Sequence, residues 1–120
     1  MKRISALFII LFLSYLHANE NASLYFYGNC STCHANGTSL SAPSITEVKA
    51  RYLSAFIKKE DFVQKISAWV YKPNQTDSLM HDAIEKYGLM PELAIDLETL
   101  KVIGEYIYET DFDAASTSKQ

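Results

Sequence analysis

Cys30-Ser31-Thr32-Cys33-His34 is the most informative stretch of this 120-residue chain. Two cysteines three positions apart lie on one side of a helical turn, because side chains at that spacing are neighbours on a helix surface. His34 lies four residues after Cys30 and belongs to the same face. The pattern therefore predicts two thiols and one imidazole ring that face a common neighbour.

Several kinds of site contain a Cys-x-x-Cys pair. A thioredoxin-like redox pair is expected near a βαβ pattern, which this sequence lacks. A zinc site needs further ligands, and no second Cys-x-x-Cys or spaced histidine pair supplies them. A local disulfide in an oxidising compartment stays open as an alternative. Because a histidine follows directly, the pattern is most typical of covalent haem attachment through Cys30 and Cys33, with His34 as an axial iron ligand.

The rest of the chain has helical periodicity. Apolar residues recur at spacings of three and four, and no alternating, strand-like segment is present. Helices are expected over about 21–30, 45–56, 59–72, 78–87 and 96–108. The prediction is an all-α domain of roughly four to five short helices joined by loops.

Caps and breakers support these bounds. Asp96 is the expected N-cap of the last helix, and Pro73 and Gly88 end the third and fourth. Four of the five helices carry apolar residues at helical spacing, in chain order as follows: Leu24, Tyr25 and Tyr27; Ile45, Val48, Tyr52 and Ala55; Phe62, Ile66, Trp69 and Val70; and Leu100, Ile103, Tyr106 and Ile107.

Residues 1–18 have the composition of an export signal. Lys2 and Arg3 precede an apolar run of about 13 residues, which is short for a membrane span of about 20, and Ala18 closes a cleavage-site pattern. An uncleaved N-terminal anchor is the alternative. We expect residues 19–113 to form the domain and the small, polar residues 114–120 to be a disordered tail.

The charge balance bears on partners. Loss of Lys2 and Arg3 with the signal leaves 9 basic and 14 acidic residues and a formal net charge of −5. Such an acidic domain is a poor nucleic-acid binder, because phosphate contacts need clustered lysine and arginine. It can instead be steered towards a basic patch on a protein partner. A domain of this size buries a modest core, so a large apolar cofactor would help to stabilise it.

Over nearly all of residues 21–111 the chain resembles the small monohaem class I cytochromes c of bacteria. The haem motif is joined by four further points of resemblance: the apolar–aromatic pair Leu24-Tyr25, Pro43 nine residues after His34, Met90-Pro91, and the final helix Leu100–Tyr108 with Tyr106. Ala22 and Ala42 stand where the family usually has glycine.

The resemblance implies a cytochrome c fold wrapped around one covalently bound haem c. It also implies that the Pro43 carbonyl accepts a hydrogen bond from Nδ1 of His34, that Met90 is the distal iron ligand, and that Tyr106 crosses the first helix. The function it implies is single-electron transfer.

Met90, Met80 and His81 are the candidates for the sixth iron ligand. A distal ligand must reach the iron from the face opposite His34, and a loop permits this more readily than a helix. Met90 lies in a proline-bound loop, whereas Met80 and His81 fall in the expected helix 78–87. We therefore expect Met90 to be the ligand.

Trp69 is a further candidate cofactor contact. Its indole N–H is able to donate to a haem propionate, although a plain core aromatic is the other interpretation. Arg51 and Lys72 are expected to be surface charges, and pairing with the propionates is the alternative.

The expected function is that of a periplasmic electron carrier that docks transiently with respiratory redox proteins. It would not be an enzyme, because two protein ligands leave the iron no position for substrate. A small-molecule substrate and nucleic acid are not expected as partners, and a membrane only if the signal is retained. The alternatives are a haem-based gas sensor and a haem subunit of a larger redox complex.

Overall fold

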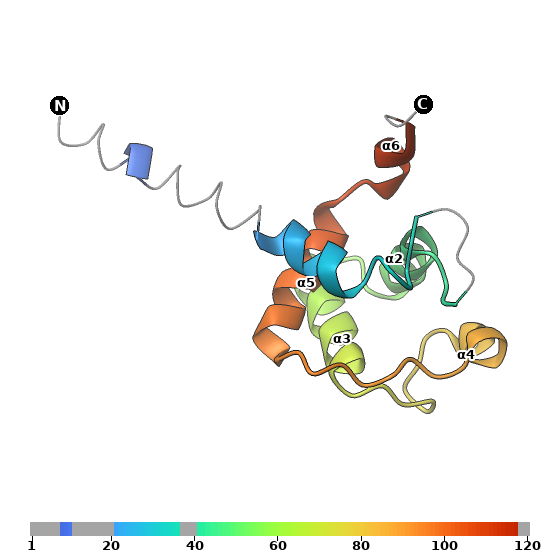
Figure 1. Cartoon of the computed structure of the whole chain (residues 1–120). Helices are drawn as coiled ribbons and strands as arrows, with labels where there is room; N and C mark the ends of the chain where they lie inside the picture. Colours follow the sequence, from blue (N-terminus) through green and yellow to red (C-terminus); the bar gives the residue numbers. More distant parts are fainter. Residues whose placement is uncertain (1–7, 11–20, 37–40, 118–120) are drawn as a thin grey trace.

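The computed structural model describes residues 8–10, 21–36 and 41–117 (Figure 1). Within these ranges all regular structure is helical, so the all-α prediction is confirmed. Helical residues 21–29 precede five labelled helices: α2 (Ile45–Ala55), α3 (Lys59–Tyr71), α4 (His81–Tyr87), α5 (Leu97–Glu109) and α6 (Phe112–Thr117). No helix in the described ranges is both long and apolar enough for a bilayer span. The expected signal lies outside them, apart from residues 8–10.

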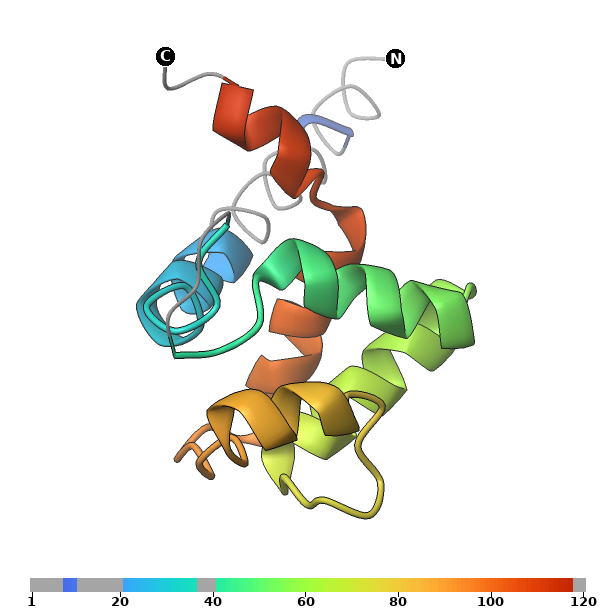
Figure 2. The ribbon, with the colours of Figure 1, turned by 90° about the vertical axis from the view of Figure 1, so that its right-hand side faces the viewer.

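The pair formed by α3 and α5 is the centre of the fold. The two helices come close at Gly104, where an added Cβ would lie 3.2 Å from Cγ2 of Ile66 and 3.6 Å from Cα of Val63. Phe62 from α3 and Ile103 and Ile107 from α5 are buried at this contact. Figure 2 shows α2 lying across the pair, with α4 and α6 at opposite ends of the molecule.

The N-terminal helical residues 21–29 pack on α5 through Phe26. Phe26 is only 1% exposed, and its ring centroid lies 5.4 Å from that of Tyr106 and 5.3 Å from that of Phe112. The expected crossing of Tyr106 over this helix is therefore present. The apolar residues that the sequence indicated for this helix are not its buried face: Leu24, Tyr25 and Tyr27 are exposed, and the buried aromatic is Phe26.

Side-chain caps start α2, which follows the Cys-x-x-Cys-His motif in the chain, and α5. Ser44 accepts a hydrogen bond from the Glu47 N–H at the start of α2, and Asp96 accepts one from the Thr99 N–H at the start of α5. The helices therefore begin where the sequence indicates. Ala55, expected on the buried face of α2, is exposed because it is the last residue of that helix.

The C-terminal segment contains a short helix. Residues 112–117 form α6, and residues 118–120 lie outside the described ranges. Oδ1 of Asp111 accepts hydrogen bonds from the N–H groups of Asp113 and Ala114, and Phe112 is 4% exposed against Phe26. Phe112 lies just before the expected tail 114–120 and packs the start of α6 on the N-terminal helical residues.

Helix α4 is tied to the rest of the fold by a side-chain connection to α2. Both terminal guanidinium nitrogens of Arg51 donate to the carboxylate of Asp82, at 3.1 and 2.9 Å, and one also donates to the Leu79 carbonyl. Arg51 is thus a surface charge, as expected, and it is paired with Asp82. Its hydrogen bonds connect α2 to the chain on either side of Met80.

Candidate cofactor-binding pocket

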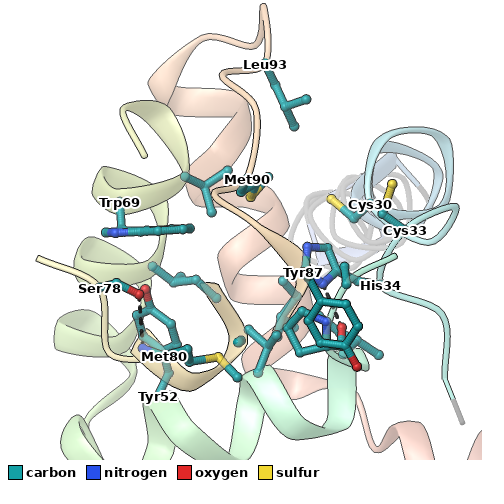
Figure 3. A pocket seen from close by; sticks show the side chains of 18 of the residues that line it. Cys30, Cys33, His34, Tyr52, Trp69, Ser78, Met80, Tyr87, Met90 and Leu93 are labelled. Carbon is teal, nitrogen blue, oxygen red and sulfur yellow. Dashed lines mark hydrogen bonds between the residues drawn. The ribbon is translucent and has the colours of Figure 1, made fainter. Parts of the chain in front are cut away.

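One pocket contains every residue predicted to contact a cofactor. It encloses about 210 Å³ between α2, α3, α4 and α5 and the loops that join them. The predicted residues that line it are Cys30, Cys33, His34, Pro43, Trp69 and Met90. The rest of the described lining is largely apolar and includes no lysine, arginine, aspartate or glutamate. Figure 3 shows the two cysteines at one end of this pocket.

The motif continues the N-terminal helix by one turn. The Cys30 N–H donates to the Phe26 carbonyl and the His34 N–H donates to the Cys30 carbonyl, both at 2.8 Å. This helical turn brings Cys30, Cys33 and His34 to the same side, as their spacing predicts. The burial of Phe26 thereby fixes the orientation of the motif relative to the pocket.

The imidazole of His34 is oriented by a backbone acceptor. Its Nδ1 lies 2.8 Å from the Pro43 carbonyl oxygen. A carbonyl can only accept, so the ring proton is on Nδ1 and Nε2 keeps its lone pair. A histidine held in this way is a prepared metal ligand, because the backbone partner fixes both the tautomer and the ring orientation. The hydrogen bond implied by the family resemblance is thus present.

The two cysteines do not have the environment of a reactive redox pair. They form no disulfide in the structure. Burial, with a smaller contribution from Cys33, raises the pKa of Cys30 to about 11. The motif lies at the C-terminal end of a helix, where the helix dipole disfavours a thiolate, whereas reactive pairs have lowered pKa values. This setting argues against thiol–disulfide exchange.

A zinc site also finds no support. Within the described ranges, no three His, Cys, Asp or Glu side chains come together in a group able to hold a metal ion. The only metal-ligating nitrogen that lines the pocket among the described residues is that of His34. A ligand set for iron within a tetrapyrrole needs only such a nitrogen and one further donor.

Two thioethers reach the pocket. Met90 lies half-buried in the loop between α4 and α5, and Met80 is 7% exposed directly before α4. Met80 was expected within a helix, but it is the N-cap residue of α4, and its N–H donates to Oγ of Ser78. Both methionines are therefore on non-helical backbone. His81 is exposed and does not line the pocket.

Trp69 lines the pocket, but its polar atom is already bonded. Nε1 of Trp69 donates to the Asn74 carbonyl at 3.0 Å. The N–H that one interpretation assigned to a propionate is therefore bonded to the loop that follows α3. What Trp69 presents to the pocket is an apolar ring surface.

Sequence reasoning did not assign the pocket residues Tyr52, Ser78 and Tyr87 to the site. Tyr52 was expected only as a core residue of α2, yet it also lines the pocket. No sequence signal marks a core aromatic whose hydroxyl faces a cavity. No protein-family model, curated protein or solved structure matches the chain.

Proposed function

We propose that this chain is a small monohaem cytochrome c of class I, which carries single electrons between respiratory redox proteins in the periplasm. The observation that carries the proposal is the convergence of Cys30, Cys33 and the Nε2 lone pair of His34 at one apolar pocket. Haem c would be held by thioether bonds to both cysteines, with His34 and Met90 as the axial ligands.

The size and lining of the pocket fit such a group. About 210 Å³ of space remains between the helices, and the side chains that line it are largely apolar. A large apolar cofactor would supply the missing contacts. The part of the chain that the structure describes encloses that space with side chains from four helices.

The residues of the chain would each have a defined part. Cys30 and Cys33 would hold the haem through thioether bonds; addition of each S–H across a vinyl group accounts for both new bonds and needs no oxidant. Burial raises the pKa of Cys30 to about 11, which keeps its sulfur as a thiol. His34 would hold the iron through Nε2, because its Nδ1–H is bonded to the Pro43 carbonyl. The haem, when bound, supplies an iron that changes between the ferrous and ferric states.

Met90 is the preferred distal ligand because Pro91 restrains its loop, while the backbone N–H of Met80 is fixed to Ser78. With both axial positions taken by the protein, electrons rather than substrates would pass through the site. Leu89 is 48% exposed and lines the same pocket, so this loop is a suitable edge for brief contact with a redox partner.

The first test is for covalent haem. The full chain is produced in a host with haem-ligation machinery, and the periplasmic fraction is examined by a pyridine haemochrome assay. We expect a c-type spectrum and pigment that stays with the protein in acidic acetone. A double Cys30→Ser, Cys33→Ser variant is the matched control and should release its pigment. A colourless wild-type protein, or one that releases its haem, contradicts the proposal.

The second test identifies the distal ligand. Met90→Ala should abolish the far-red iron–sulfur charge-transfer band of the oxidised protein, and Met80→Ala should retain it. The opposite result would move the ligand to Met80. Absence of the band from the oxidised wild type would exclude methionine ligation. Carbon monoxide added to the reduced wild type at neutral pH should leave the Soret band unchanged, whereas an immediate shift favours a gas-binding protein.

A further inference from the structure

Tyr52 on α2 has a hydroxyl group without a hydrogen-bond partner among the described residues. Its side chain is 5% exposed, and its ring is packed against Phe56 and Phe62. Burial alone raises its pKa to about 12, with no hydrogen bond contributing, so the hydroxyl keeps its proton. In the described ranges every fully enclosed side-chain oxygen has a partner. The oxygen of Tyr52 is therefore not fully enclosed, and Figure 3 shows Tyr52 beside Ser78 in the pocket that both residues line.

The other buried hydroxyls of the pocket are at least partly bonded within the protein. Oγ of Ser67 donates to the Val63 carbonyl at 2.5 Å. Oγ of Ser78 accepts from the Met80 N–H, which leaves the proton of Ser78 able to donate elsewhere. Tyr52 and Ser78 are thus the two buried donors that can serve a bound group. A donor buried without an acceptor destabilises a fold, so an acceptor inside the pocket is expected.

The position of Tyr52 and Ser78 in the pocket indicates which acceptor group would bond to them. Figure 3 shows Tyr52 and Ser78 at the end of the pocket away from Cys30 and Cys33. In haem c the two carbons that bond to cysteine lie at one edge of the ring, and the two propionate carboxylates lie at the other. The described lining contains no lysine or arginine, so any carboxylate in this part of the pocket depends on neutral donors.

Resting on the proposed function, we infer that the Tyr52 hydroxyl donates a hydrogen bond to a propionate carboxylate of the bound haem, with the Ser78 hydroxyl as a second donor. Trp69 was the other candidate donor to a propionate, but its N–H is bonded to the Asn74 carbonyl. A hydrogen bond to the ionised carboxylate offsets part of its negative charge. Tyr52 would thereby favour ferrous iron, since uncompensated negative charge nearby stabilises the ferric state.

Tyr52→Phe tests this inference because it removes one oxygen and leaves the packed ring in place. Tyr87→Phe is the matched control: Tyr87 also lines the pocket, but its hydroxyl interacts with Lys86, whose pKa it raises. Both variants are compared with the haem-loaded wild type. In Tyr52→Phe we expect the propionate bending band in the resonance Raman spectrum to shift. The reduction equilibrium should also fall about threefold to tenfold, or roughly 30–60 mV. Neither change is expected in Tyr87→Phe.

The outcomes separate this inference from the proposed function. A wild type without covalent haem refutes both. A haem-loaded Tyr52→Phe protein with an unchanged band and potential refutes the hydrogen bond alone, as does an equal response in Tyr87→Phe. If Tyr52→Phe does not mature, the reduced wild type is examined by NMR. Nuclear Overhauser contacts between the Tyr52 ring protons and the propionate methylenes are then expected, and their absence overturns the inference.

Discussion

Replacement of Phe26 by alanine should remove the main contact between the N-terminal helical residues and the rest of the fold. An aromatic side chain that buries about 200 Å², at about 25 cal/mol per Å², contributes about 5 kcal/mol. Phe26 is 1% exposed and contacts the rings of Tyr27, Tyr106 and Phe112 at centroid distances of 5.3, 5.4 and 5.3 Å. Since alanine keeps only the Cβ, we expect the free energy of unfolding to fall by about 3–5 kcal/mol.

Guanidinium denaturation of the haem-loaded protein measures this difference. Leu24→Ala and Tyr25→Ala are the matched controls, because both residues lie on the same helix but are 67% and 42% exposed. Each control should change the free energy of unfolding by about 0.5 kcal/mol or less. A larger loss in Tyr25→Ala than in Phe26→Ala would refute the orientation of this helix and, with it, the presentation of the haem motif to the pocket.

Three further measurements address local features. Ser44→Ala removes the N-cap of α2 and should lower the free energy of unfolding by about 1 kcal/mol, as measured by denaturation. Gly88→Ala should lower the free energy of unfolding by about 1–2 kcal/mol, because Gly88 has φ of 87°. Gly104→Ala should stay near wild type, because the 3.2 Å contact of the added Cβ with Ile66 offsets the better helix propensity. Equal effects of the two substitutions would contradict this contrast. Burial raises the pKa of Tyr52 from its ordinary 10.0 to about 12. The protonated form therefore stabilises the fold fully below pH 10, and this contribution is lost as the pH rises towards 12. Tyr52→Phe should flatten this alkaline decline in the free energy of unfolding, and an unchanged decline would contradict the assignment.

The helix bounds were accessible from the sequence because they depend on short-range chemistry. Ser44 and Asp96 cap the helices that follow them through bonds to residues three positions on, and Gly88 ends α4. The position of each helical face was less accessible. Apolar residues at 24, 25, 26 and 27 permit more than one orientation, and only the aromatic partners on α5 and α6 select Phe26.

In the candidate site, too, some features were predictable from the sequence and others were not. The spacing of Cys30, Cys33 and His34 places them on one side of a turn whatever surrounds it. The donor and acceptor partners of other residues depend on which loop lies opposite. Trp69 bonds to Asn74 instead of facing the pocket with its N–H, and Met80 enters the pocket because Arg51 holds the chain on either side of it.

From the sequence alone come the Cys-x-x-Cys-His pattern, the helical class and the helix caps, because each depends on residues within one or two turns of each other. Tertiary structure alone decides that Phe26 anchors the motif, that Phe112 of α6 packs on Phe26, and that Tyr52 lines the pocket. These outcomes depend on contacts between residues far apart in the chain, whose geometry arises only when the helices pack.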